Sequence, residues 1–212
     1  MSGKPIPPKP GRGAGAQRLA EILRVDHAGE LAAVQIYRGQ QAVLGGAPVA
    51  RHFAEMERQE AEHLARFDGL LTEQRVRPTA LAPGWTLAGF ALGAGTALLG
   101  EKAAHACTEA VETVIEEHYA GQIAELAERE PELAAELARF RDEELAHRDL
   151  AVEEGAREVP GHRLLSAGIG AGCRAAIKLS EKILRKIDEI FPKGGHYVDY
   201  YSADFGPNAR PV

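Results

Sequence analysis

Two parts of the chain repeat the same polar pattern, and this repeat restricts the fold more than any other feature of the sequence. In each part a Glu is followed, at identical spacing, by a Tyr and a Gly-Gln pair, and a Glu-x-x-His motif stands further downstream. The first copy contains Glu30, Tyr37, Gly39, Gln40, Glu60 and His63, and the second contains Glu112, Tyr119, Gly121, Gln122, Glu144 and His147. Two similar halves of this kind predict a helical bundle with approximate two-fold symmetry.

The chain has helical periodicity almost throughout from Gln17 to about Ile190, and no stretch alternates as a β-strand does. Gly and Pro divide it into predicted segments at about 17–44, 49–74, 83–100, 101–129, 132–155 and 162–190. We therefore expect an all-α protein. It would have a four-helix bundle within residues 17–190, a flexible N-terminal tail at 1–16 and a C-terminal tail at 191–212.

The composition excludes several classes of protein. Hydrophobic residues make up 45% of the chain and charged residues 26%, which is typical of a folded, Ala- and Leu-rich helical protein. The net charge of −6 argues against a nucleic-acid partner. Two cysteines, Cys107 and Cys173, are too few for a disulfide scaffold or a thiolate metal cage, so a reducing compartment is expected. Residues 1–15 lack the apolar run of a secretory signal.

The two Glu-x-x-His motifs have the spacing of a shared site, because residues three apart lie on one face of a helix, about one turn apart. Folding each helical hairpin at its turn returns the upstream Glu to the level of the motif. In the first hairpin the rise is roughly 22 Å from Glu30 to the turn at Gly45 and roughly 18 Å from Pro48 to Glu60. In the second hairpin the rises on either side of Pro131 are roughly 28 Å and roughly 20 Å.

Four glutamates and two histidines are therefore predicted to converge inside the bundle: Glu30, Glu60, His63, Glu112, Glu144 and His147. This is the ligand set of ferritin-like di-iron or di-manganese carboxylate proteins. Four carboxylates neutralise two divalent ions, and oxygen and imidazole ligands suit iron or manganese better than the thiolate sites that zinc often takes. A single Glu-x-x-His motif usually marks a solvated helix face, so the prediction depends on the repetition.

Other polar residues near the level of the predicted ligands can be interpreted in two ways. Tyr37 and Tyr119 fit either packing in the core or hydrogen bonds near the metals. His27 and His118 fit either satisfied histidines or groups that move protons and orient ligands. Tyr119 and His118 are our candidate catalytic residues. No role is assigned to His52, His105, His162 and His196.

Short motifs along the chain form a second pattern. They are RVDHAGE at 24–30, IYRGQ at 36–40, RVRPT at 75–79, GFALGAGTALLG at 89–100, ACT at 106–108, AVE at 110–112, FRDEE at 140–144, AGCR at 171–174 and LSE at 179–181. Together they resemble the demethoxyubiquinone hydroxylases of ubiquinone biosynthesis over about residues 20–183.

The resemblance implies a non-haem di-iron monooxygenase. Such an enzyme hydroxylates the ring of a polyprenyl demethoxyubiquinol, using two iron ions, dioxygen and electrons that come ultimately from NADH. By motif, two of the predicted ligands would bridge the irons and the other four would be terminal. The bridging residues would be Glu60 and Glu144, and the terminal ones Glu30, His63, Glu112 and His147.

A membrane surface is an expected partner, because a polyprenyl quinone is almost insoluble in water. The uncharged segment at 83–100 is only marginally long enough for a hydrocarbon core of roughly 30 Å, and its glycines lower helix propensity. We expect it and the segment at 162–180 to be membrane-interfacial, with Trp85 as an anchor. The alternative is a buried helix that packs on the bundle. The expected location is the cytoplasmic face of a bacterial inner membrane, or the matrix side of the mitochondrial inner membrane in a eukaryote.

Two other classes of function stay open. A ferroxidase, an iron store or a peroxide-reducing di-iron protein would need a shell-forming oligomer or a cysteine-rich electron-transfer module, and the sequence shows neither. A non-catalytic helical protein that binds quinones or lipids would hold no metal. The sequence also leaves open a homo-oligomer, a lipid-binding accessory protein and contacts with other ubiquinone-biosynthesis enzymes.

Overall fold

The computed structural model describes residues 14–190, and every regular element in this range is helical. The elements are α1 (Ala14–Leu44), α2 (Ala50–Glu73), α3 (Ala82–Ala97), α4 (Glu101–Leu126), α5 (Pro131–Glu153), the 3₁₀-helix η1 (Ala156–Glu158) and α6 (His162–Ile190). The prediction of an all-α chain is confirmed. The predicted tails lie outside the described residues, except that residues 14–16 begin α1.

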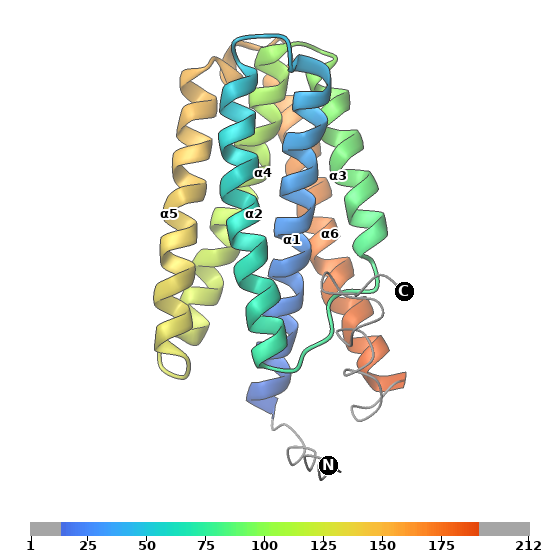
Figure 1. Ribbon diagram of the computed structural model, residues 1–212, viewed down its shortest axis with the longest axis vertical. Coiled ribbons are helices and arrows are strands. Elements are labelled where there is room, and N and C mark those ends of the chain that lie inside the picture. Colours follow the sequence, from blue (N-terminus) through green and yellow to red (C-terminus); the bar gives the residue numbers. More distant parts are fainter. Residues whose placement is uncertain (1–13, 191–212) are drawn as a thin grey trace, which may run out of the picture.

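Four long helices, α1, α2, α4 and α5, run side by side as a ferritin-like four-helix bundle (Figure 1). The pairs α1–α2 and α4–α5 are antiparallel hairpins, and each hairpin contains one copy of the sequence repeat. Helix α3 connects the hairpins by running back along α1, as a long crossover connection does. Between α3 and α4 the chain reverses at Gly100, whose φ of 109° is readily adopted only by glycine.

Two glycines allow α3 to approach the backbone of α1. A Cβ atom built at Gly93 would lie 1.9 Å from the carbonyl oxygen of Ile36. One built at Gly89 would lie 2.5 Å from the carbonyl oxygen of Ala32. No side chain fits at either position, so the glycines that lower the helix propensity of this segment are the residues that make its contact with the bundle.

Exposed apolar side chains lie on the faces of α3 and α6 that point away from the bundle, and in the turn after α3. Figure 1 shows both helices on the side of the bundle away from α5, with α3 packed against α1 and α6 against α4. The exposed residues, which we call the apolar face, are Leu87, Phe90, Leu98, Leu99, Leu164 and Leu179. Segment 83–100 thus packs on the bundle through one face only. Within residues 14–190, no helix has both the length and the apolar character needed to cross a membrane.

Two apolar clusters hold the bundle together on either side of a polar layer. Along α2, Met56 belongs to one cluster with Tyr37 and Phe53, whereas Phe67 belongs to a second cluster with Phe140. The Glu-x-x-His motif of α2 lies between Met56 and Phe67. The polar layer is therefore closed from both ends by packed side chains, which fixes the position of its charged groups.

Candidate metal centre

The six residues predicted as metal ligands come together in this polar layer. One group consists of Glu30, Glu60, His63 and Glu144, and another of Glu60, Glu112, Glu144 and His147. Within each group, one potential ligand atom from every residue lies within 4.8 Å of the others. All six side chains are buried, with exposed fractions of no more than 4%. Since Glu60 and Glu144 belong to both groups, the arrangement is compatible with two metal ions on either side of a shared pair of carboxylates.

The unsatisfied atoms of these residues also fit a metal site. Buried polar atoms normally have a hydrogen-bond partner, and leaving one without costs about 1–3 kcal/mol. Among the described residues, the ligand candidates have several such atoms without a hydrogen-bond partner. These are Oε2 of Glu30, both carboxylate oxygens of Glu60 and Glu144, Oε2 of Glu112, and Nδ1 of His63 and His147. They are the atoms that two cations would satisfy.

The pKa shifts of the buried groups in the layer also favour a metal site. Burial and the neighbouring carboxylate of Glu144 raise the pKa of both Glu60 and Glu112 above the usual glutamate value. Burial lowers the pKa of His63, but the carboxylates of Glu144 and Glu30 outweigh it and raise this pKa above the ordinary value. The carboxylates therefore retain protons or attract them to the histidines, and divalent cations would replace those protons.

Two residues that the sequence analysis did not single out orient the histidines. The Nε2 atom of His63 lies 2.6 Å from Oε2 of Glu143 on α5, and the Nε2 atom of His147 lies 2.5 Å from Oε1 of Gln59 on α2. With Nε2–H donating to these oxygens, the Nδ1 atoms face the carboxylate layer, where each would bind a metal ion after losing its proton. Gln59 and Glu143 each stand directly before the Glu of a Glu-x-x-His motif. A polar residue at the same position in both copies of the repeat is therefore the sequence feature that could have identified them.

The two repeat tyrosines bond across the bundle. The hydroxyl of Tyr37 on α1 donates to Oε1 of Glu112 on α4, and the hydroxyl of Tyr119 on α4 donates to Oε1 of Glu30 on α1. Both tyrosines are 1% exposed, so they are core residues as well as hydrogen-bond donors. Each hairpin thus holds one carboxylate of the other hairpin and leaves Oε2 of that carboxylate without a hydrogen-bond partner.

The candidate residues His118 and His27 lie outside this layer. The Nε2 atom of His118 is 3.4 Å from Oδ1 of Asp26, which also accepts a hydrogen bond of 2.7 Å from Gln122. Burial lowers the pKa of His118, but the Asp26 carboxylate outweighs this and raises it. The Nε2 atom of His27 lies 3.0 Å from Oδ1 of Asp68 and so links α1 to α2.

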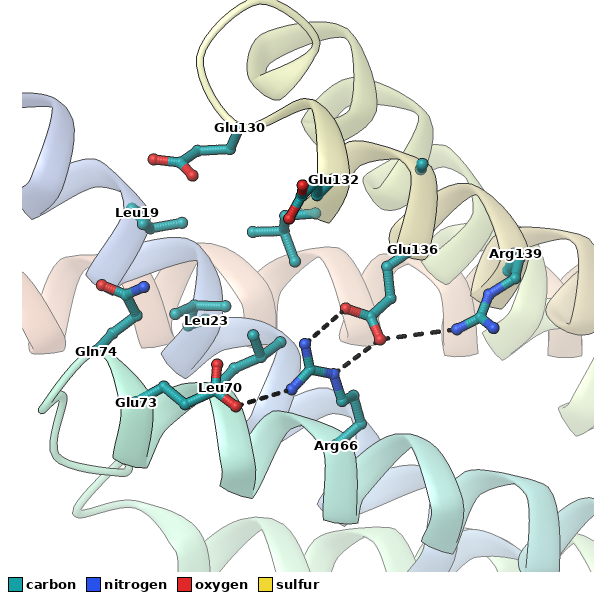
Figure 2. Close-up of a pocket in the computed structure, with 12 residues that line it drawn as sticks. Leu19, Leu23, Arg66, Leu70, Glu73, Gln74, Glu130, Glu132, Glu136 and Arg139 are labelled. Atoms are coloured by element: carbon teal, nitrogen blue, oxygen red, sulfur yellow. Dashed lines mark hydrogen bonds and ion pairs between the residues drawn. The ribbon is translucent and has the colours of Figure 1, made fainter.

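A pocket of about 480 Å³ opens at the end of the bundle where α1 begins, between α1, α2 and α5 (Figure 2). Arg66 forms ion pairs there with Glu136 and Glu73, at 2.8 and 3.2 Å. The charged lining residues are Arg66 and Arg139 against Glu73, Glu130, Glu132 and Glu136. None of the predicted metal ligands lines this pocket. Its excess of carboxylates is unfavourable for an anionic cofactor such as a nucleotide.

Comparison with known proteins gives consistent matches. The family model described as "Ubiquinone biosynthesis protein COQ7" matches residues 17–180. A protein of Bos taurus named "NADPH-dependent 3-demethoxyubiquinone 3-hydroxylase, mitochondrial" is 51% identical over 171 residues, which are 79% of each chain. A protein of Rhodospirillum rubrum named "3-demethoxyubiquinol 3-hydroxylase" is 51% identical over 178 residues, or 82% of each chain.

A more distant relative gives the same result. The "5-demethoxyubiquinone hydroxylase, mitochondrial" of Saccharomyces cerevisiae is 40% identical over 190 residues, which cover 80% of each chain. The matched region includes both hairpins and all six buried ligand candidates. From its sequence and its fold, the chain belongs to the family of the ubiquinone biosynthesis protein COQ7.

Proposed function

We propose that this protein is a monooxygenase that hydroxylates the ring of a polyprenyl demethoxyubiquinol in ubiquinone biosynthesis. Two iron ions would be held by the six buried residues, with Glu60 and Glu144 shared between them. The observation that carries the proposal is the pair of buried ligand groups with common carboxylates, whose inward atoms lack hydrogen-bond partners among the described residues. The names of relatives that are about half identical to this chain supply the reaction class.

The residues of the chain would prepare the site for this reaction. Two iron ions would supply the activation of dioxygen. One oxygen atom enters the ring and the other leaves as water, which takes two electrons and two protons. The packed side chains around the layer exclude water, and Gln59 and Glu143 keep the two imidazoles oriented. Tyr37 and Tyr119 hold the two carboxylates Glu112 and Glu30 in place.

The reductant would be a reduced nicotinamide nucleotide. The family resemblance implies electrons from NADH, whereas the mammalian relatives are named NADPH-dependent. Turnover of the purified protein with each nucleotide, and with each nucleotide plus a reductase, separates the two sources. We expect both nucleotides to be competent when electrons reach the site through a reductase.

The test of the proposed function is oxygen transfer from ¹⁸O₂ to a short-chain demethoxyubiquinol. We expect the hydroxylated product of the purified, iron-loaded protein to carry one ¹⁸O atom. A ferroxidase would oxidise Fe²⁺ without labelling the quinol, and a non-catalytic binding protein would form no product. Unlabelled quinol together with full iron loading would therefore reject the monooxygenase.

Tyr119→Phe is expected to slow hydroxylation about ten-fold while the iron content stays near that of the wild type. The substitution removes one hydrogen bond to a buried carboxylate, worth about 1.5–3 kcal/mol, but keeps Glu30 as a ligand. Turnover and elemental analysis of the same preparation measure both effects. Tyr37→Phe is the matched comparison, because Tyr37 bonds Glu112 in the other half of the repeat. Unchanged turnover in Tyr119→Phe would leave Tyr119 as a packing residue.

His118 would have a supporting part in proton supply. It lies half-buried beside Asp26, which stands one turn before Glu30 on α1. Gln122 joins the same group through its bond to Asp26. Protons would pass through this group toward Glu30, which lies one turn further along α1.

The apolar face of α3 and α6 would contact a membrane, where a polyprenyl substrate is dissolved. Leu98, Leu99 and Leu164 are 75%, 70% and 82% exposed. Leu99 and Leu164, together with Leu165, line an apolar pocket of about 500 Å³. We propose a peripheral protein, on the cytoplasmic face of a bacterial inner membrane or the matrix side of a mitochondrial one. A homo-oligomer or a lipid-binding accessory protein would be further partners of the same face.

Leu164→Glu is expected to weaken binding to phosphatidylcholine vesicles at least about ten-fold, because burial of one leucine contributes roughly 1.5–3 kcal/mol. Co-sedimentation of the full chain with the vesicles measures this. Ala135→Glu adds the same charge at an exposed position of α5, away from α3 and α6, and should bind as the wild type does. Equal binding by the two variants, or no binding by the wild type, would reject the membrane contact.

A further inference from the structure

A second group of potential metal ligands lies at the end of the bundle where α2 and α4 begin and α5 ends. His52, His105 and Glu154 each have one potential ligand atom within 4.8 Å of the others. From the geometry of this group, we propose that it forms a mononuclear site for a divalent transition-metal ion, separate from the candidate di-metal centre. The proposal does not depend on the proposed function.

The helical periodicity explains why these residues meet. His105 stands seven residues before Glu112 on α4, and His52 stands eight before Glu60 on α2. Glu154 follows His147 by seven residues at the end of α5. Seven or eight residues are about two turns, or roughly 10–12 Å, so these positions lie on the same helix faces as the residues of the candidate di-metal layer. The second group therefore lies roughly 10–12 Å further along the bundle axis.

The surroundings of His105 favour a ligand over simple packing. Its side chain is 0% exposed and packs against Phe53, with ring centroids 4.8 Å apart. Neither ring nitrogen has a hydrogen-bond partner among the described residues. Burial lowers the pKa of His105 to about 4, so the imidazole is neutral at pH 7 and has a free lone pair. A histidine in such a place leaves two buried polar atoms unsatisfied, which a metal ion would relieve in part.

The other two residues complete an open site. The Nδ1 atom of His52 is buried without a hydrogen-bond partner and lies 3.7 Å from Oε1 of Glu154. Glu154 is exposed, so its side chain can move toward the two imidazoles to complete bonds of about 2.1 Å to one ion. With the metal on Nδ1, the proton of His52 is on Nε2, and the exposed Arg51, now 3.3 Å from Nε2, turns to solvent.

The donor set defines the class of metal. Two imidazoles and one carboxylate suit Zn²⁺, Fe²⁺ or Co²⁺, whereas Mg²⁺ and Ca²⁺ prefer sites made of oxygen alone. Three protein ligands leave coordination positions for water. The ion would join α2, α4 and α5 at this end of the bundle, so its binding should also raise the thermal stability of the protein.

The test counts metal ions in the full-length protein. The protein is first loaded under anaerobic conditions with about two equivalents of Fe²⁺ per chain, enough for the six-ligand layer alone. It is then titrated with Co²⁺, whose absorption bands report the ligand environment. We expect one more ion per chain in the wild type than in His105→Gln or Glu154→Gln, with cobalt affinity weakened at least about ten-fold in both variants. Iron content of the buried layer and its spectrum should be unchanged in these variants.

Matched controls separate a specific site from surface binding. Glu153→Gln changes the exposed neighbour of Glu154, and His162→Gln changes a histidine that pairs with Glu109 and Ser166. Both should keep the additional ion and the rise in melting temperature on adding Co²⁺. Equal metal counts in the wild type and Glu154→Gln would overturn the proposal, and Glu154→Gln carries little risk of misfolding because its side chain is exposed. Survival of the ion in both His105→Gln and Glu154→Gln would also overturn it.

Discussion

Glu60→Ala is expected to lower quinol hydroxylation by more than about a hundred-fold and to remove bound iron. Loss of residues that only orient metal ligands already costs about 10–100-fold in affinity or activity, and Glu60 belongs to both ligand groups. It is 0% exposed, so the substitution leaves a buried space in which no carboxylate remains to bind the metal. Turnover of a short-chain demethoxyubiquinol and elemental analysis measure the two losses. Glu144→Ala should have the same effect, since Glu144 is the other shared carboxylate.

The matched control for this prediction is Glu62→Ala. Glu62 lies on the same helix, is exposed, and pairs with Arg58 at the surface. It should retain full turnover and iron content. Glu60→Gln fills nearly the same space as the wild-type side chain, and its circular dichroism shows whether a loss of iron reflects the missing ligand or a disrupted fold. Full activity and iron content in Glu60→Ala would remove Glu60 from the ligand set.

Gly93→Ala is expected to lower the free energy of unfolding by about 3 kcal/mol, the upper end of the usual cost of overpacking. The added methyl group would stand 1.9 Å from the carbonyl oxygen of Ile36, and a backbone atom cannot move aside as a flexible side chain does. For a chain of this size we expect a fall of roughly 6–12 °C in melting temperature. Thermal unfolding followed by circular dichroism measures it.

Gly95→Ala provides a control two residues away on the same helix. A Cβ atom at Gly95 has nothing within 4 Å, so the substitution brings only the better helix propensity of alanine. It should raise the stability by roughly 0.5–1 kcal/mol. A lower free energy of unfolding in Gly93→Ala and a higher one in Gly95→Ala would establish the close contact of α3 with α1. Equal melting temperatures would reject it.

The sequence permitted prediction of the helices and of the residues that approach one another along them. Periodicity and the positions of Gly and Pro located α2 and α5 to within one or two residues, because helix ends depend mainly on nearby residues. The Glu-x-x-His spacing placed Glu60 beside His63, and Glu144 beside His147, since positions three apart share a helix face. Counting the rise from each turn brought Glu30 and Glu112 to the same level, and the structure has all six residues within two adjoining groups.

The contacts between helices depended on the tertiary structure. The sequence did not indicate that Tyr37 bonds Glu112 and Tyr119 bonds Glu30, because periodicity gives the face of a helix but not the rotation and register of its neighbours. The contacts of Gln59 with His147 and of Glu143 with His63 likewise depend on how α2 packs beside α5.

The grouping of His52, His105 and Glu154 is the clearest case of contacts that only the tertiary structure revealed. These residues come from three helices, and no local motif links them. The amino-acid sequence by itself determined the all-α fold, the paired hairpins and the polar layer, because these follow from periods and spacings within single helices. The tertiary structure decided which side chains meet across the bundle and how closely α3 approaches α1, because those depend on packing between segments far apart in the chain.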